Sequence, residues 1–433
     1  MQREALNQLI TWKKNPDRKP LIFRGARQVG KTWLLKEFAK TQYEDSIYVN
    51  FESNEIVKNL FDESFEPQRI LFKLMTFSGI EPKPGKTLII FDEIQEAPKG
   101  LTSLKYFCED APEYHVVAAG SLLGIVLHQH VSFPVGKVDF IDLYPMNFIE
   151  FLYAIGKEQY VQLLQKQDWT TVKMFKSQFT EWLRLYYLVG GMPEAVASFA
   201  HNSDFTKVRR IQKNILDHYE SDFSKHAPAE VVPRIRLVWN SILPQLSKEN
   251  RKFIYGKIKQ GARAREFELA MAWLLDCGII KQVFRVAKPG LPLKSYTDFS
   301  AFKLYLVDIG LMASMAQLDA KVILEGSRIF EEFKGALTEQ FVFQQLVQKE
   351  ELVITYWSAE RSENEIDFLL QYANKIIPIE VKAAENLNAK SLKAFCAKYQ
   401  PQNAIRTSLS DYRQEEWMTN IPLYAINHAH LLL

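Results

Sequence analysis

The sequence predicts an α/β protein whose N-terminal part is built on a parallel β-sheet. Residues 25–32 fit G-x-x-x-x-G-K-[ST], the phosphate-binding loop, and lie between an apolar run and a helical pattern. A continuous apolar run at residues 88–91 ends in an acidic pair, which is typical of a buried parallel strand that leads to a ligand site. Strand-like and helix-like segments alternate along residues 1–155, which favours helices on both faces of the sheet.

The elements of this first domain follow from the spacing of apolar residues. Helices repeat apolar residues every three or four positions, whereas buried strands are short apolar runs. In chain order, helices are expected at 1–14, from about 30 to 40 and at 55–78, and strands at 21–23, 46–52, 86–95, 114–120 and 137–143.

The fixed positions of the phosphate-binding loop each have a physical role. Glycines at both ends allow backbone angles that a side chain would forbid, so the N–H groups can turn inward around phosphate oxygens. The helix that begins near Gly30 adds the positive end of its dipole. A chance match in an ordinary turn is the alternative, and the flanking strand and helix disfavour it. The predicted nucleotide-binding residues are Gly25, Ala26, Arg27, Gln28, Val29, Gly30, Lys31 and Thr32.

The second half of the same site is expected where the third and fourth strands end. Asp92 is predicted to hold Mg²⁺ and Glu93 to orient the attacking water; the alternative is an acidic pair that merely ends a strand. Ser121 follows the fourth strand and is a candidate for contact with the γ-phosphate or the water, with a helix N-cap as the alternative. The predicted catalytic residues are therefore Lys31, Glu93 and Ser121, and the predicted metal ligands are Thr32 and Asp92.

These motifs, together with LYPMNFIEFL at residues 143–152, resemble the AAA+ ATPases. More narrowly, they resemble the bacterial and archaeal family in which the ATPase is joined to an uncharacterised C-terminal domain. The resemblance implies ATP and Mg²⁺ as cofactors and homo-oligomers in which a neighbouring subunit supplies an arginine, although a monomer or dimer is equally allowed. Family members usually carry Gly-Arg where this chain has Gly136-Lys137, so no arginine role is assigned there.

The middle of the chain is predicted to be helical at residues 156–250 and winged-helix-like at 251–325. GGMPEAV at 190–196 and LYLVDIGLM at 304–312 are further points of resemblance to the same family, which implies a helical lid over the nucleotide. A basic cluster just before the second helix of the winged helix suits DNA contact, or equally a solvated face on a module for packing or oligomerisation. The cluster consists of Lys257, Lys259, Arg263 and Arg265.

Residues 326–433 read as a helix at 327–349 followed by strands at 352–358, 365–372 and 375–383. Strand alternation places Glu380 and Lys382 on one face, and a hairpin turning near Asn374 brings Asp367 beside them. This pattern, with a glutamate on the preceding helix, resembles the restriction-endonuclease-like fold and implies a second Mg²⁺ site. The alternative is a retired nuclease core whose polar residues form a buried network. The candidate residues are Glu339, Asp367, Glu380 and Lys382.

Length and composition set the outer limits of these interpretations. A chain of 433 residues predicts two to four domains. The net charge of +3 neither requires nor excludes nucleic acid as a partner. Three cysteines without a CxxC pair predict a reducing compartment and no structural zinc. Because no apolar stretch suits a signal peptide or a membrane span, we expect a cytoplasmic protein without a membrane partner.

Three functional hypotheses follow from the sequence. The leading one is a Mg²⁺-dependent ATPase of the AAA+ type that couples its nucleotide state to DNA or to a partner. The second is an ATP-gated DNA-binding protein or metal-dependent nuclease acting through the C-terminal domain. The third is an interaction module in which ATP controls assembly.

Overall fold

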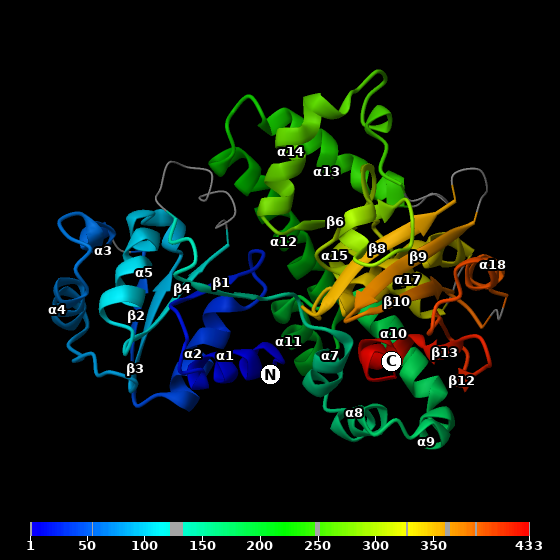
Figure 1. The fold of residues 1–433 in the computed structure, drawn as a ribbon, viewed down its shortest axis with the longest axis horizontal. Helices are drawn as coiled ribbons and strands as arrows, with labels where there is room; N and C mark the ends of the chain where they lie inside the picture. Colours follow the sequence, from blue (N-terminus) through cyan, green and yellow to red (C-terminus); the bar gives the residue numbers. More distant parts are fainter. Residues whose placement is uncertain are drawn as a thin grey trace. The chain divides into compact units, whose positions relative to one another are not determined.

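The computed structural model describes residues 2–53, 55–121, 133–246, 252–325, 328–359, 364–385 and 388–432. They form two compact units. The first comprises Met1–Tyr144 with Asp276–Ile279, and the second comprises Pro145–Leu275 with Ile280–Leu433. Each unit is built around its own β-sheet (Figure 1).

The first unit contains a five-stranded sheet in the order β2-β3-β4-β1-β5, and every neighbouring pair is parallel. This confirms the predicted parallel-sheet α/β domain. All six residues of β3 are buried, as the continuous apolar run predicted. The strands are β1 (Leu21–Arg24), β2 (Asp45–Asn50), β3 (Thr87–Asp92), β4 (His115–Gly120) and β5 (Asp139–Asp142).

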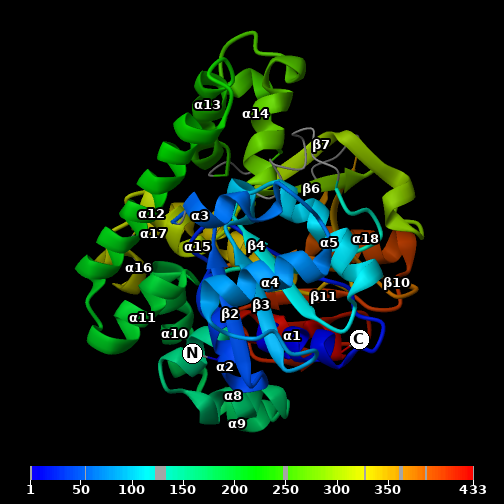
Figure 2. The same cartoon turned by 90° about the vertical axis from the view of Figure 1, so that its left-hand side faces the viewer.

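Helices cover this sheet because their apolar faces need a partner. One face packs against α4 and α5, where Leu74 and Phe107 meet strand residues such as Ile89 and Val116 in one hydrophobic cluster (Figure 1 and Figure 2). The helical elements of the unit are α1 (Ala5–Lys14), α2 (Lys31–Gln42), α3 (Glu55–Lys58), η1 (Asn59–Phe61), α4 (Pro67–Ser78), η2 (Ile94–Glu96) and α5 (Lys99–Asp110).

The helix expected at 55–78 is interrupted. The chain forms α3 and η1 first, and α4 begins only at Pro67. Proline has no N–H for an intrahelical hydrogen bond and is favoured in the first turn of a helix, so the break falls in front of it. The local signal was therefore present in the sequence.

Helices dominate the first part of the second unit, as predicted for residues 156–250. Gly190 ends α10 with a positive φ of 71°, and Pro193 starts α11, which matches the expected break at GGMP. The helices are α7 (Phe148–Ala154), α8 (Glu158–Gln165), α9 (Trp169–Met174), α10 (Lys176–Val189), α11 (Pro193–Asn202), α12 (Phe205–His226), α13 (Val232–Leu246), η3 (Tyr255–Lys257), α14 (Ala264–Asp276), η4 (Leu293–Tyr296), α15 (Ile309–Met315), α16 (Ala320–Glu325), α17 (Arg328–Leu346), α18 (Lys390–Tyr399) and η5 (Leu423–Leu432).

The second sheet has eight strands in the order β12-β13-β11-β10-β9-β8-β6-β7. Its β6–β7 hairpin comes from the segment expected to form a winged helix, and β6 pairs in parallel with β8, which lies beyond residue 326. Strands on both sides of this expected domain boundary therefore share one sheet. The strands are β6 (Ile280–Val286), β7 (Thr297–Leu306), β8 (Leu352–Ser358), β9 (Glu365–Tyr372), β10 (Lys375–Val381), β11 (Ile405–Ser408), β12 (Arg413–Gln414) and β13 (Thr419–Pro422).

The start of the second unit is held by one glutamine of α17 and by a second glutamine in the turn that follows this helix. Gln348 donates from Nε2 to the carbonyl oxygen of Pro145 at 3.0 Å. The main-chain N–H of Phe148 donates to Oε1 of Gln345 at 2.8 Å. The chain is thus anchored by side chains as soon as it enters this unit.

No helix in the described ranges combines the length and the hydrophobicity that crossing a membrane requires.

Candidate nucleotide site

The phosphate-binding loop lies between β1 and α2, the context that its sequence predicted. Gly30 has φ 94° and ψ 23° and immediately precedes α2, so glycine removes the strain of a left-handed conformation there. A Cβ atom on Gly25 would lie 2.4 Å from the carbonyl oxygen of Leu143. Since Leu143 also donates its N–H to the Arg24 carbonyl at 2.7 Å, the loop and the end of β5 are too close for any side chain at position 25.

Lys31 brings a buried positive charge to the end of the loop. Its side chain is 7% exposed, and Nζ donates to the carbonyl oxygens of Gly25 and Ala26 at 2.9 Å each. Burial lowers the pKa of Lys31 to about 8, although the charges of Glu93 and Asp92 act in the opposite direction. In the described part of the chain, no carboxylate forms an ion pair with this ammonium group. A bound anion would therefore relieve an unfavourable burial.

Asp92 and Thr32 meet at the end of β3. The Thr32 hydroxyl donates to Oδ2 of Asp92 at 2.7 Å, and the Tyr48 hydroxyl donates to the same oxygen at 2.8 Å. The carboxylate is 1% exposed. Burial, together with the Asp92 charge, raises the pKa of Tyr48 to about 12, so its hydroxyl remains a donor. Oxygen ligands of these two types suit Mg²⁺, and the structure brings the two predicted metal ligands into direct contact.

Glu93 lies in the turn that follows β3, where it adopts φ 51° and ψ 46°. Its carboxylate oxygen Oε2 accepts a hydrogen bond from Nε2 of Gln95 at 2.6 Å. Ser121 is buried and directly follows β4, the strand that lies between β3 and β1. Because the carboxyl ends of parallel strands share one edge, Lys31, Asp92, Glu93 and Ser121 all belong to this edge of the sheet.

The sequence interpretation missed three residues that support this site. Tyr48 and Gln95 lie close to recognised motifs and carry polar groups, so a search of flanking residues could have found them. Arg3 has no local signal: it donates to the Val29 carbonyl at 3.1 Å and to the Tyr144 carbonyl at 2.6 Å. These acceptors are 26 and 141 residues away along the chain, so only the tertiary fold reveals the contact.

The C-terminal candidates form two separate sets of contacts. The β9–β10 hairpin turns between Tyr372 and Lys375, as predicted, and its pairing extends to Ile379 opposite Phe368, the residues next to Glu380 and Asp367. Glu380 pairs with Lys382 at 2.7 Å and accepts the Leu392 N–H at 3.1 Å. Asp367 instead accepts the main-chain N–H of Val381 at 2.8 Å.

Glu339 belongs to the other set. It is 1% exposed, and its Oε1 accepts hydrogen bonds from the Tyr305 hydroxyl and from Lys303 Nζ, the latter at 3.2 Å. Lys303 also forms an ion pair with Glu365 at 2.5 Å. Across the described ranges, no group of three or more His, Cys, Asp or Glu residues is arranged to hold a metal ion. The hydrogen bonds of Glu339 described above go to Lys303 and Tyr305 of β7, whereas Asp367, Glu380 and Lys382 lie on or directly after the β9–β10 hairpin.

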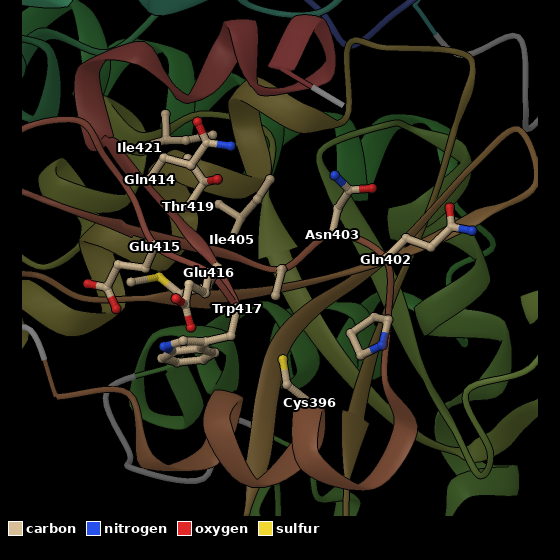
Figure 3. Close-up of a pocket in the computed structure, with 13 residues that line it drawn as sticks. Cys396, Gln402, Asn403, Ile405, Gln414, Glu415, Glu416, Trp417, Thr419 and Ile421 are labelled. Atoms are coloured by element: carbon tan, nitrogen blue, oxygen red, sulfur yellow. The ribbon is translucent and has the colours of Figure 1, made fainter.

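A cavity of about 250 Å³ lies in the second unit beside the C-terminal end of α18. Figure 3 shows Glu416 and Trp417 on one side of it and Gln402 and Asn403 on another. None of the predicted site residues lines this cavity. Burial and the Glu380 charge raise the pKa of the Cys396 thiol to about 11, so this lining residue is a poor nucleophile.

Comparison with protein families gives three matches along the chain. Residues 17–152 match the AAA domain. This match covers the phosphate-binding loop, Asp92 and Glu93, and it supports a nucleotide-binding ATPase of the AAA type in the N-terminal part. Residues 180–322 match a domain of unknown function (DUF8612), and residues 334–426 match another (DUF4143). Neither description names a nuclease.

Individual relatives are distant. An uncharacterized protein of Methanocaldococcus jannaschii is 22% identical over 90% of this chain and 81% of its own length. A Walker-type ATPase of Pyrococcus abyssi is 15% identical, with a TM-score of 0.46 over 73% of this chain and 95% of that one. The Orc1 protein of Aeropyrum pernix, solved in complex with DNA, is 14% identical, with a TM-score of 0.27 over 73% and 92%. TM-scores this low do not establish a shared overall arrangement.

Proposed function

We propose that this protein binds ATP with Mg²⁺ at the edge of its parallel sheet and hydrolyses it. The observation that carries the proposal is a buried Lys31, bonded only to main-chain carbonyl oxygens among the described residues, directly followed by Thr32, which is hydrogen-bonded to Asp92. All three residues lie inside the segment that matches the AAA domain. Each group is of the type that a triphosphate and its metal require.

The proposal assigns a role to each residue of the site. Main-chain N–H groups of residues 25–30 and the Lys31 ammonium would bind the phosphates. Thr32 and Asp92 would hold Mg²⁺, which neutralises phosphate charge when bound. Glu93 would orient the attacking water, and Ser121 would contact the γ-phosphate or that water. Glu93 receives this role in the proposal because it directly follows Asp92, the last residue of β3.

A change of one atom at Glu93 tests the proposal. In Glu93→Gln, we expect ATP affinity to persist while turnover falls by about 100-fold or more, since the amide is a far weaker proton acceptor. Turnover is measured by phosphate release with Mg²⁺ and with EDTA, which should abolish it. Glu96→Gln, three residues along in the same turn, is the matched control and should stay within about twofold of the unmodified protein.

The same experiment has two contrary outcomes. Normal turnover in Glu93→Gln would show that this residue does not orient the attacking water. If calorimetry with the intact, folded chain detected no ATP binding, the proposed ATPase function would be refuted.

DNA contact is a second candidate function, favoured by the exposure of one basic cluster. The four side chains at Lys257, Lys259, Arg263 and Arg265 are all exposed. They precede or begin α14, which follows α13 and leads into the β6–β7 hairpin. This order of two helices and a hairpin is compatible with a helix entering the major groove.

Charge removal at the cluster tests DNA contact. Arg263→Ala/Arg265→Ala should weaken binding of duplex DNA. The slope of log affinity against log salt concentration should become shallower by about two, which corresponds to the loss of two phosphate contacts. Lys390→Ala/Lys393→Ala, which removes the same charge from the exposed face of α18, is the control. Unchanged, salt-insensitive binding in the arginine variant would refute this candidate.

The C-terminal nuclease hypothesis has a direct test of its own. Supercoiled plasmid is incubated with Mg²⁺ or Mn²⁺ and either the intact protein or Asp367→Ala. Nicking that depends on Asp367 would support the hypothesis, and equal cleavage by both proteins would discard this site as its source.

A further inference from the structure

The turn after β3 holds Glu93 in an unusual backbone conformation. With φ 51° and ψ 46°, Glu93 occupies the left-handed region, which residues other than glycine, asparagine and aspartate rarely adopt. Its N–H donates to Oδ1 of Asp92 at 3.1 Å, and its carbonyl oxygen accepts the Glu96 N–H at 3.0 Å. Such outliers persist where the surroundings determine them, and they concentrate at functional sites.

The next residue fixes this turn to the core. Ile94 is completely buried. A Cβ atom on Gly100 would lie 2.4 Å from Cδ1 of Ile94 and 2.7 Å from Cε2 of Phe61, so Ile94 fills the space that the glycine leaves. Packing of Ile94 against α5 and η1 therefore holds the turn in addition to the hydrogen bonds of Glu93.

Gln95 follows Ile94 and points its amide back at Glu93. Nε2 of Gln95 donates to Oε2 of Glu93 at 2.6 Å. Its Oε1 is buried and accepts no hydrogen bond from any described residue. A flipped amide would place that oxygen against the carboxylate, which is repulsive, so the donor orientation is the one the site requires.

We infer that Gln95 is a positioning residue for the hydrolytic water. By holding Oε2 of Glu93 it fixes the rotamer of the carboxylate and leaves Oε1 to accept a hydrogen bond from the water. The group that Gln95 acts through is Glu93, and Gln95 itself touches no reacting atom. This inference rests on the proposed ATPase function and deepens it by naming what orients the residue that orients the water.

Gln95→Met tests the inference because methionine keeps the length and the unbranched shape of the side chain but cannot donate. We expect kcat for ATP hydrolysis to fall about tenfold, while KM, the dissociation constant for ATP and the thermal unfolding midpoint stay unchanged. Gln68→Met, at an exposed position of α4, is the matched control. If Gln95→Met does not fold, Gln95→Asn tests the same contact, because its amide is one methylene too short to reach Oε2.

A double-mutant cycle separates positioning from a general structural effect. In Glu93→Ala there is no carboxylate to position, so adding Gln95→Met should change the residual single-turnover rate by less than about twofold. An additive tenfold loss in that background would overturn the inference, as would kcat near the unmodified value in Gln95→Met alone. Full activity in Glu93→Ala would instead refute the proposed role of Glu93, which distinguishes the two failures.

Discussion

The two units each bury a lysine, and the two lysines are satisfied in opposite ways. Lys303 is fully buried and lies between two carboxylates, those of Glu339 and Glu365. Lys31 is nearly as buried, yet the only hydrogen bonds that its ammonium makes to residues that the structure describes go to main-chain carbonyl oxygens. A neutralised cluster holds elements together, whereas a buried charge without a counter-ion is prepared for an anion. The contrast distinguishes a structural network from the proposed binding site without reference to any motif.

The largest expected effect breaks the structural network. Lys303→Met leaves two carboxylates without their counter-charge, and we expect the free energy of unfolding to fall by about 3–5 kcal/mol. Urea denaturation measures it. The double variant Lys303→Met/Glu339→Gln should recover part of the loss, because the unpaired negative charge of Glu339 is then removed. A loss below about 1 kcal/mol would mean that the network contributes little and that the comparison with Lys31 fails.

The next effect falls on the binding site. Lys31→Met should raise the dissociation constant for ATP by about 100-fold, equivalent to about 2.7 kcal/mol, because the phosphates lose a desolvated positive charge. Calorimetry measures the affinity. Lys40→Met removes the same charge from an exposed position of the same helix and should change the affinity by less than about threefold. Equal losses in the two variants would indicate a diffuse electrostatic effect and not a specific contact.

The pH dependence of ATP affinity sharpens the same contrast. With its pKa lowered to about 8, Lys31 loses its proton above that pH in the free protein, while bound phosphates favour the charged form. Binding then requires proton uptake, so the dissociation constant should rise by up to about tenfold per pH unit above pH 8 and be nearly flat just below it. Calorimetric titrations across this range measure it. A slope that persists in Lys31→Met would assign the titration to another group.

The same pKa shift has a consequence for stability with a definite sign. Between about pH 8 and the ordinary lysine pKa of 10.5, the unfolded chain binds more protons at Lys31 than the folded one. The Lys31 contribution to the free energy of unfolding therefore increases as the pH rises through this window, as the cost of the buried charge disappears.

The smallest expected effect is at the partly exposed pair of Glu380 and Lys382. The Lys382 side chain is 30% exposed, so solvent screens the pair, and Glu380 keeps its hydrogen bond from the Leu392 N–H. Lys382→Ala should lower the free energy of unfolding by about 1 kcal/mol, measured by urea denaturation. A loss as large as that of Lys303→Met would place this pair among the structural networks.

The sequence was sufficient where the signal was local. The phosphate-binding loop, the buried third strand and the turn near Asn374 depend on fixed spacing over a few residues, and the structure shows each in the expected context. The pairing of Glu339 with Lys303 depends on how a helix docks on a distant strand, 36 residues away. No spacing rule encodes that docking, so the four C-terminal candidates could be recognised as a pattern while their actual partners could not.

Leu143 packs against the phosphate-binding loop close to the end of the first unit. It contacts the loop at Gly25 and Arg24 and is followed by a single residue, Tyr144, before the second unit begins. The carbonyl oxygen of Tyr144 accepts a hydrogen bond from Arg3, and that of Pro145 accepts one from Gln348. A side-chain hydrogen bond thus reaches the backbone on each side of this junction, each from within its own unit. A bound phosphate that shifted the loop would therefore press first on the Leu143 carbonyl, which lies within the first unit.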